Sequence, residues 1–462
     1  MTADRTTSSS TKPEPLGARF RALLASATLT NLADGVVQTG IPLYAVTLTR
    51  SPGQIALITA AAWLPWLVLG IPAGVVVDRH DRRTVQVVAL CARVAILLAG
   101  SGLAVAGLLP VPALIALVLA YGVTDVLVDL AQSALVPGVV PRSRLQAANG
   151  RMVAVQQVAA SFVGAPLGGV ILALGAGWVL GLPAALVVVA ALLLRAVPRA
   201  RPAATGLPQP GTAVDDGPAQ APAPVPGRRS LAEVREGVGF LVRHPVLRPL
   251  LVAGSVANMC FTGYTAVLVL WVVGDDSRVG MSAAQYPLLG AALAVGAIGG
   301  ALTVERLMRV AGELRLMLGC WAVMSLMLLV PVLVPRPIAI GASFFLLGLT
   351  NTVANVLSQS MRQRLVPAGM LGRVGGASRT LAFGLMPLGA ALAGVVAEAV
   401  GLAPVLTGAA MLSLVGLAYP MARVRQTMVT AADTERVEPV NGGAEAPVDD
   451  ASEGCAAVAA SR

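Results

Sequence analysis

Four ionisable side chains interrupt long apolar runs of the sequence and are the first candidates for chemistry. Asp34 and Arg93 stand in two such runs, and Asp125 and Asp129 stand in a third. Because Asp125 and Asp129 are four residues apart, a helix places both carboxyl groups on one face. Charged groups at bilayer depth are costly and are functional candidates by default. We therefore treat all four as candidate site residues.

The sequence lacks the motifs of metal-dependent, serine-nucleophile and ATP-hydrolysing proteins. His80 and His244 are the only histidines, so an HExxH metal motif cannot form, and the G-x-S-x-G motif is absent. Lys12 is the only lysine and has no glycine loop around it, which argues against a P-loop and an ATP-driven pump. We expect no enzymatic activity, no metal and no cofactor. The four cysteines are Cys91, Cys260, Cys320 and Cys455. No two of them have the CxxC spacing typical of metal-binding or redox motifs.

The elements that must position the four charges are long apolar helices. Of 462 residues, 56% are hydrophobic and only 12% are charged, against roughly 25% charged in average soluble domains. A bilayer core about 30 Å thick requires roughly 20 apolar residues per helix. We therefore predict an all-α integral membrane protein with 12 transmembrane helices in two six-helix bundles. The expected spans are 22–47, 54–77, 84–109, 111–136, 152–174 and 176–194, then 246–273, 283–304, 316–334, 338–360, 374–399 and 402–422.

A gap between the two sets of spans marks a linker. Eight prolines between 198 and 230 indicate a flexible segment. From Leu231 onward, apolar residues at helical spacing among charges predict a short amphipathic helix on the membrane face, or else a helix that only extends the next span. The expected segments are a polar tail 1–21, a first bundle 22–197, the linker with its helix 198–245, a second bundle 246–425 and a disordered tail 426–462.

The arginines report the orientation of the chain in the membrane. With both termini in the cytoplasm, the four short inner loops hold twelve arginines and the outer loops hold three. This bias follows the positive-inside rule and predicts a multi-pass plasma-membrane protein with both termini cytoplasmic. The net charge of +10 is then a topology signal, and we expect no nucleic-acid partner. The first half contains Leu-Val-Pro at 135–137 followed by Pro-Leu-Gly at 166–168. The second half contains the same two tripeptides in the same order, at 365–367 and 387–389, which indicates a parallel pseudo-repeat.

The charges of the third and fourth spans lie at similar depths. Arg93 is roughly 14 Å from the inner end of its span at 1.5 Å per residue, while Asp125 and Asp129 are roughly 16 and 10 Å from theirs. We expect a charge network among them. In the alternative, Asp129 pairs with Arg82 in the loop below. Glu398, at the outer end of the eleventh span, is expected to be solvated.

A loop motif carries a family resemblance. The sequence Gly-Val-Val-Val-Asp-Arg-His-Asp-Arg-Arg at 74–83 matches the G-x-x-x-D-R-x-x-R-R signature of the major facilitator superfamily, in the expected loop between spans two and three. We expect Gly74 to permit close helix approach and Asp78 to cap a neighbouring helix N-terminus. The resemblance implies that the loop stabilises one of two alternating-access states; otherwise its arginines serve only the positive-inside rule. Its signature residues are Gly74, Asp78, Arg79, Arg82 and Arg83.

Two further stretches refine this resemblance. Gly164-Ala165-Pro166-Leu167-Gly168-Gly169 in span five is similar to the glycine- and proline-rich antiporter motif of the superfamily, with the proline one position late. The alternative is a small-residue helix interface. The stretch 235–248 before span seven resembles the branch that contains enterobactin exporters and macrolide efflux proteins. The motif residues are Gly164, Pro166, Gly168 and Gly169.

The resemblance implies that spans one, four, seven and ten line a central cavity. Asp34 and Asp125 are then proton or cation-substrate sites, and Arg93 is their structural partner. Span four lacks the arginine that proton-coupled drug exporters of related branches often carry. Three amides on the other lining spans, which offer hydrogen bonds to a substrate or else join helices, are Asn258, Asn351 and Asn355.

These observations predict a secondary active transporter that exports a small amphiphilic molecule by alternating access. A drug, a macrolide, a siderophore or a secondary metabolite fits, and proton antiport supplies the energy. The alternative is an uptake permease of the same fold; a membrane sensor or an intramembrane enzyme fits less well. Expected partners are the small-molecule substrate and the lipid bilayer, and we expect a monomer.

Overall fold

The computed structural model describes residues 17–141, 144–197, 231–367, 370–425 and 427–428, and this part of the chain is almost entirely helical. Within it, eleven helices are long and apolar enough to cross a membrane. One isolated β-bridge joins Val273 to Met281. The described part of the chain therefore has the helical architecture of a multi-pass membrane protein. Most of both expected tails and the proline-rich part of the expected linker lie outside the described residues.

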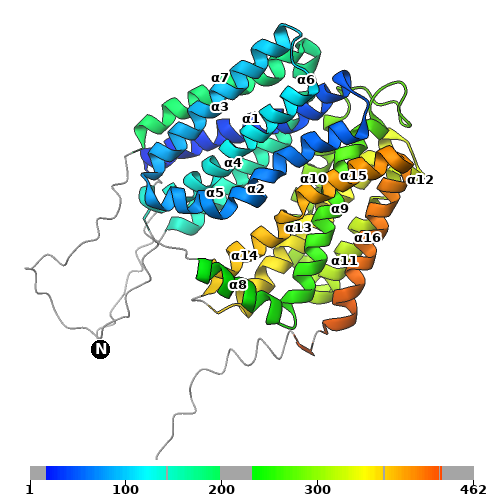
Figure 1. Cartoon of the computed structure of the whole chain (residues 1–462). Coiled ribbons are helices and arrows are strands. Elements are labelled where there is room, and N and C mark those ends of the chain that lie inside the picture. The colour runs from blue at the N-terminus through cyan, green and yellow to red at the C-terminus, as the bar shows by residue number, and fades with distance from the viewer. Residues whose placement is uncertain (1–16, 142–143, 198–230, 368–369, 426, 429–462) are drawn as a thin grey trace, which may run out of the picture.

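The first half forms one group of helices (Figure 1). Its fifth span consists of three consecutive pieces, the middle one a π-helix, and its sixth ends in a 3-10 turn. The elements are α1 (Ala18–Leu48), α2 (Pro52–Arg79), α3 (Arg82–Val105), α4 (Val111–Val139), α5 (Leu145–Gln157), η2 (Val158–Gly164), α6 (Ala165–Leu174), α7 (Ala176–Leu193) and η3 (Leu194–Ala196).

The second half lies beside the first and begins with a short helix that precedes its spans (Figure 1). This helix ends at Arg243, and the next begins at Leu247, so it does not simply extend the seventh span. The elements are α8 (Leu231–Arg243), α9 (Leu247–Val272), α10 (Pro287–Ala311), α11 (Glu313–Met327), α12 (Val330–Leu333), α13 (Pro337–Leu365), α14 (Leu371–Gly384), α15 (Met386–Val400) and α16 (Leu402–Arg423).

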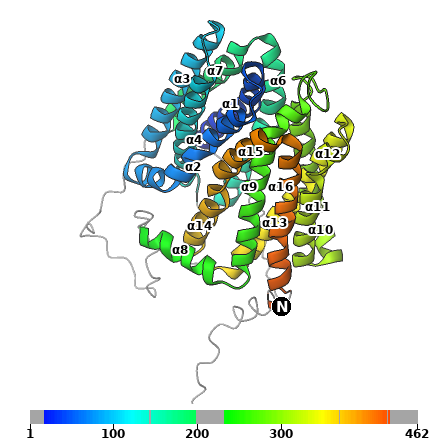
Figure 2. The ribbon, with the colours of Figure 1, turned by 45° about the vertical axis from the view of Figure 1, so that its right-hand side comes forward.

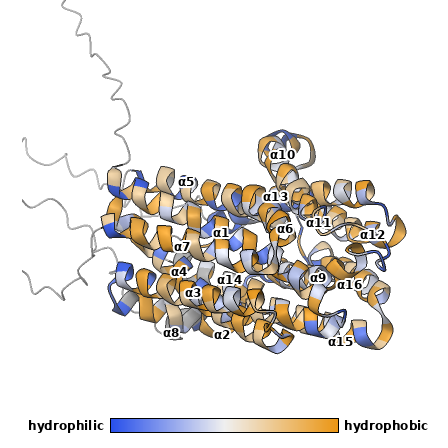
Figure 3. Ribbon diagram, turned by 90° about the horizontal axis from the view of Figure 1, so that it is seen from above, coloured by the Kyte–Doolittle hydropathy of each residue, from blue (hydrophilic) through white to orange (hydrophobic). Residues whose placement is uncertain are grey.

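The long helices give the molecule two distinct ends. α5 and α8 lie at one end and α12 and α15 at the other, with predominantly hydrophobic ribbon between them (Figure 3). We call these the α8 end and the α12 end. Apolar side chains remain exposed along the helices, for example Val88, Leu302 and Val395. Such an apolar surface is suited to contact with lipid.

α1 is long enough to span a bilayer but is not among the eleven apolar helices. Its 31 residues extend about 46 Å at 1.5 Å per residue. Polar residues lower its hydropathy, but the helix packs against α7, α6, η2 and α5. Thr30 and Asn31 are buried and donate hydrogen bonds to the carbonyl oxygens of Ser26 and Ala27. A helix that buries its polar face in protein does not need a fully apolar sequence.

The two halves approach each other most closely towards the α12 end. α2 packs against α9, α14 and α15 (Figure 2). α6 and η2 pack against α10. A Cβ atom on Gly394 of α15 would lie 3.1 Å from the Cα atom of Gly53, in the first turn of α2. Farther along α2, the rings of Trp63 and Phe383 stack with their centroids 6.4 Å apart. Small residues and stacked rings therefore close the two halves against each other at this end.

Candidate functional site

A buried ion-pair cluster joins three helices of the first half. Nη1 of Arg93 on α3 lies 2.8 Å from Oδ1 of Asp34 on α1, and its Nη2 lies 2.9 Å from Oδ1 of Asp125 on α4. The Arg93 side chain is 0% exposed, whereas those of Asp34 and Asp125 are 14% and 33% exposed. The guanidinium is thus enclosed between two carboxylates, and Asp125 is the more accessible of the two.

Three neutral side chains complete this cluster. The Tyr121 hydroxyl donates to Oδ1 of Asp34, and its ring lies 4.5 Å from the Arg93 guanidinium carbon, in a cation–π arrangement. Nε of Arg93 donates to Thr124 Oγ1 at 3.1 Å. Trp66 Nε1, from α2, donates to Oδ2 of Asp125 at 3.2 Å. The cluster therefore connects α1, α2, α3 and α4.

Sequence reasoning missed these neutral partners. Tyr121 precedes Asp125 by four residues, so a helix places the two on one face, and this spacing was an available signal. Trp66 stands on another helix, and its sequence position gives no comparable signal. No feature of the sequence pairs Asp34 with Arg93 in particular.

The charges of the cluster do not cancel when all groups are ionised. Arg93 supplies one positive charge, and Asp34 and Asp125 supply two negative charges. Asp129 stands one helical turn from Asp125, towards the α8 end. Arg82, the alternative partner expected for Asp129, donates instead to the Ala134 carbonyl oxygen at 3.0 Å. An excess of carboxylate in an apolar surrounding favours a proton or a cation as the compensating charge.

The candidate amides of the second half divide into two groups. Nδ2 of Asn258 on α9 donates to the carbonyl oxygen of Ala382 on α14 at 3.1 Å, so this amide joins two helices. Asn351 and Asn355 on α13 are both exposed, and Nδ2 of Asn355 donates to Oδ1 of Asn351 at 3.2 Å. With Gln359 they form a polar stripe at intervals of four residues on one face of α13. This stripe keeps hydrogen-bonding groups accessible at membrane depth.

The signature loop between α2 and α3 ties together helices of its own half. Arg83 Nη2 donates to the carbonyl oxygen of Arg195, after α7, at 3.3 Å, and Arg82 reaches α4 as described. Arg79 occupies the last turn of α2 and is exposed. The side chain of Asp78 lies outside the described residues. Asp81 is the N-cap of α3, where its Oδ1 accepts from the Thr84 backbone N–H at 2.7 Å, a role that the motif suggests for Asp78.

The expectation for Gly74 is wrong in this structure. A Cβ atom at Gly74 would meet no described atom within 4 Å, so within the described structure no helix approaches this glycine closely. Gly74 lies in the last turns of α2, near the α8 end, whereas α2 makes its close contacts with the second half nearer the α12 end.

The antiporter-like motif forms a close crossing with α1. A Cβ atom on Gly164 would lie 2.7 Å from the Leu32 carbonyl oxygen, and one on Gly168 would lie 2.8 Å from that of Val36. Pro166 follows the π-helix η2 in the first turn of α6. Gly169 faces the second half, where a Cβ atom would lie 3.0 Å from Pro287 Cδ. The motif is thus a small-residue helix interface, and it also borders the contact between the halves.

At the α12 end, polar contacts bridge the halves. Glu398, near the end of α15, accepts from Ser51 Oγ at 2.5 Å and from the Gly53 backbone N–H at 3.2 Å, at the start of α2. Arg50 Nη1 donates to the Val273 carbonyl oxygen, just after α9, at 3.1 Å. Glu398 is exposed, as expected, and also caps a helix of the opposite half.

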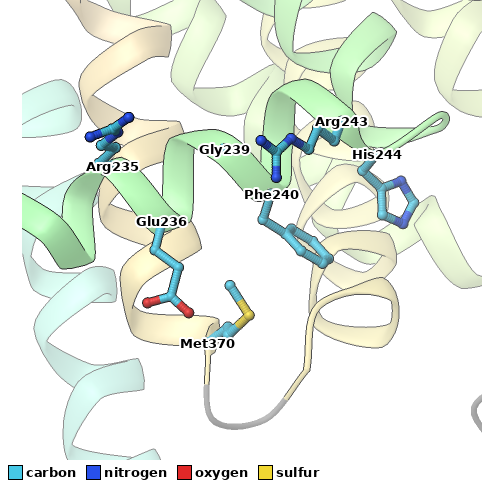
Figure 4. Close-up of a pocket in the computed structure, with 7 residues that line it drawn as sticks. All are labelled: Arg235, Glu236, Gly239, Phe240, Arg243, His244 and Met370. Carbon is cyan, nitrogen blue, oxygen red and sulfur yellow. The ribbon is translucent and has the colours of Figure 1, made fainter.

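A hollow of about 700 Å³ lies beside α8 (Figure 4). Its basic and acidic side chains point in different directions in the close-up, so they do not converge on one ligand position. His244 Nδ1 accepts from the Val246 and Leu247 backbone N–H groups at 3.2 Å and so caps α9. Among the described residues, no group of three or more His, Cys, Asp or Glu side chains is placed to hold a metal ion. The lining residues are Arg235, Glu236, Gly239, Phe240, Arg243, His244 and Met370.

Two bundles of membrane-spanning helices in one chain, with charges enclosed at membrane depth, are typical of secondary transporters. The family description "Major Facilitator Superfamily" matches residues 23–391, and the chain belongs to this superfamily. The enterobactin exporter EntS of Escherichia coli O1:K1 is 29% identical over 374 residues, covering 77% of this chain and 80% of the exporter.

Solved structures show the same fold at low sequence identity. The nucleoside transporter NupG aligns with a TM-score of 0.65 at 14% identity, covering 88% of this chain and 99% of NupG. A bacterial homologue of the iron transporter ferroportin, in an inward-facing state, aligns with a TM-score of 0.66 at 16% identity, covering 89% of this chain and 100% of the homologue. These likenesses establish the twelve-span, two-bundle fold.

Proposed function

We propose that this transporter exports a small amphiphilic molecule, with siderophores as the first substrate class to test, in exchange for protons. The observation that carries the proposal is the Asp34–Arg93–Asp125 cluster, an ionisable centre with more carboxylates than cations at membrane depth. The relationship to an enterobactin exporter supports both the direction and the substrate class. The arginine bias of the loops supports cytoplasmic termini, with the α8 end facing the cytoplasm.

The cluster can couple protons to substrate by competition. With both carboxylates ionised the cluster carries one net negative charge, which either a proton or a cationic substrate can compensate, so binding of the substrate favours release of the proton. Asp125 is the more exposed carboxylate and receives the Trp66 N–H, so it is the group that meets the substrate first. Asp34, with a side chain only 14% exposed, is the more buried carboxylate and is the group that we expect to take up and release the proton.

Alternating access requires contacts that open and close. The halves are closed by α2, α15 and the polar bridges at the α12 end, so this conformation is closed to the outside in the proposed orientation. The polar stripe of Asn351 and Asn355 offers hydrogen bonds to a substrate that enters from the cytoplasm. An amphiphilic molecule with several oxygen atoms suits such a surface.

An uptake permease is the second candidate, because the fold itself is shared with transporters such as NupG. The two directions differ in what a proton gradient does. In everted vesicles with an acidified interior, an exporter accumulates substrate in exchange for protons. An importer coupled by symport does not accumulate substrate under this gradient.

The test uses everted membrane vesicles and enterobactin as the probe. Asp34→Asn is expected to abolish gradient-driven accumulation and the matching substrate-induced proton release, while the protein stays in the membrane at normal levels. Glu236→Gln, on α8, is the matched control because it removes a carboxylate outside the spans. Proton-coupled accumulation that persists in Asp34→Asn would remove Asp34 from the mechanism. If wild type does not move the probe, a panel of other siderophores and macrolides decides the substrate class, and failure of all of them contradicts the proposal.

A further inference from the structure

A second feature lies away from the ion-pair cluster, on the outer surface of the first half. A groove of about 450 Å³ runs between α3 and α7. Val88 and Leu192 on its walls are 62% and 49% exposed, so the groove opens towards the surrounding lipid. Its lining is apolar apart from one end, and consists of Arg83, Thr84, Val87, Val88, Cys91, Val94, Val188, Ala191, Leu192 and Arg195.

Two arginines stand at the polar end of this groove. Arg83 is the second residue of α3, and Arg195 follows the last turn of α7, so both lie where the spans emerge at the α8 end. Within the described part of the chain neither arginine forms an ion pair. The Arg83 Nη2 contact with the Arg195 carbonyl oxygen uses one of five guanidinium donors and holds Arg83 at the mouth of the groove. Asp81, the acidic residue nearest in sequence, uses Oδ1 to cap α3 at Thr84.

The length of the groove matches one leaflet of a bilayer. Val94 stands eleven positions after Arg83 on α3, which corresponds to about 16 Å along the helix. Half of a hydrocarbon core about 30 Å thick is about 15 Å. An acyl chain whose headgroup lies at the arginines would therefore contact apolar side chains of the groove across the full thickness of one leaflet.

We propose that this groove binds an anionic phospholipid. The phosphate lies against the guanidinium groups of Arg83 and Arg195, and one acyl chain follows the apolar walls of α3 and α7 towards Val94. Basic pockets between transmembrane helices hold lipid headgroups through the same combination of charge and apolar contact. The proposal holds for either direction of transport.

Cys91 provides a reporter inside the groove. It is exposed, whereas Cys260 and Cys320 are buried, and Cys455, outside the described residues, is replaced by serine. The full-length Cys455→Ser protein in detergent is alkylated with a maleimide and followed by intact mass. Dioleoyl phosphatidylglycerol is expected to slow Cys91 alkylation at concentrations at which dioleoyl phosphatidylcholine does not. In Arg195→Gln the concentration for half-protection is expected to rise about fivefold, the effect of one interfacial cation.

A matched variant distinguishes lipid binding in the groove from a general effect of positive charge at the α8 end. Arg315→Gln, an exposed arginine at the start of α11 and also at the α8 end, is expected to leave protection by phosphatidylglycerol unchanged. Arg83→Gln is the second groove variant and should match Arg195→Gln. Equal protection by the two lipids, or an unchanged midpoint in both groove variants, would overturn the proposal. So would protection by inorganic phosphate alone, or protection that grows with protein concentration without lipid, which would assign the groove to a second copy of the chain.

Discussion

Arg93 and Asp34 lie 59 residues apart in the sequence, and their side chains meet at 2.8 Å in the interior of the first half. Arg93 is fully buried and is held from the other side by Asp125. A buried ion pair is costly to break because the remaining charge loses its compensation in a poorly polar surrounding. The cluster therefore has a structural consequence that can be measured apart from transport.

Replacing Arg93 should destabilise the protein strongly. In Arg93→Gln, two carboxylates lose their cation, and we expect the free energy of unfolding to fall by about 3–5 kcal/mol. Asp34→Asn should cost less because Asp125 still compensates Arg93. In the triple variant Arg93→Gln, Asp34→Asn, Asp125→Asn, most of the stability should return without transport. Thermal unfolding in detergent measures all three, and a wild-type transition in Arg93→Gln would contradict the argument.

Tyr121 is expected to position Asp34 through its hydroxyl. Tyr121→Phe keeps the ring under the Arg93 guanidinium but removes the hydrogen bond to the carboxylate, which should cost about 1.5–3 kcal/mol. We also expect a change in the pH profile of substrate-driven proton release in everted vesicles, because the charged form of Asp34 loses a donor.

A second tyrosine provides the control for this prediction. The Tyr264 hydroxyl is buried without a hydrogen-bond partner in the described structure. Tyr264→Phe should therefore leave stability unchanged or raise it slightly, since no bond is lost. If both variants behave alike in unfolding and in transport, the Tyr121 hydroxyl has no special role.

The fold was predictable to a large extent because apolar runs of bilayer length leave few alternatives. The expected spans lie on the observed helices, with ends that differ by several residues. α1 begins at Ala18 rather than at 22, and the fifth span starts at Leu145. Polar and small residues extend a helix beyond the hydrocarbon core, where hydropathy no longer marks its end. The π-helix η2 has no signal in apolar periodicity.

The site was predictable only in part. Charges are so few in the spans that Asp34, Arg93 and Asp125 could be named from sequence. Their partners depend on how the helices rotate against one another, which local sequence does not encode. Trp66 entered the cluster for this reason, and Gly74 proved to face open space. The roles of these residues in transport stay predictions.

The span-five motif should be sensitive to a single methyl group. In Gly168→Ala the new Cβ atom would lie 2.8 Å from the Val36 carbonyl oxygen, so α1 and α6 must separate. Overpacking of this kind costs about 1–3 kcal/mol, and a wider crossing should also reduce the rate of substrate accumulation. Gly102→Ala, within α3, meets nothing within 4 Å and should be neutral. Equal effects of the two substitutions on unfolding temperature and transport would refute the packing argument.

Glu398 should bias the transporter towards the conformation closed at the α12 end. Its carboxylate joins Ser51 and the first turn of α2, where a negative charge is stabilised by about 0.3–1 kcal/mol. Glu398→Ala removes this contact between the halves, so the population open to the outside should rise about two- to fivefold. Labelling of an Asn351→Cys reporter by an impermeant thiol reagent from outside measures that population, in a background without native cysteines. Glu313→Ala is the matched control, because Glu313 pairs with Arg364 inside the second half and bridges no gap between halves. If labelling does not rise in Glu398→Ala, or rises equally in Glu313→Ala, the Glu398 contact does not hold the halves together.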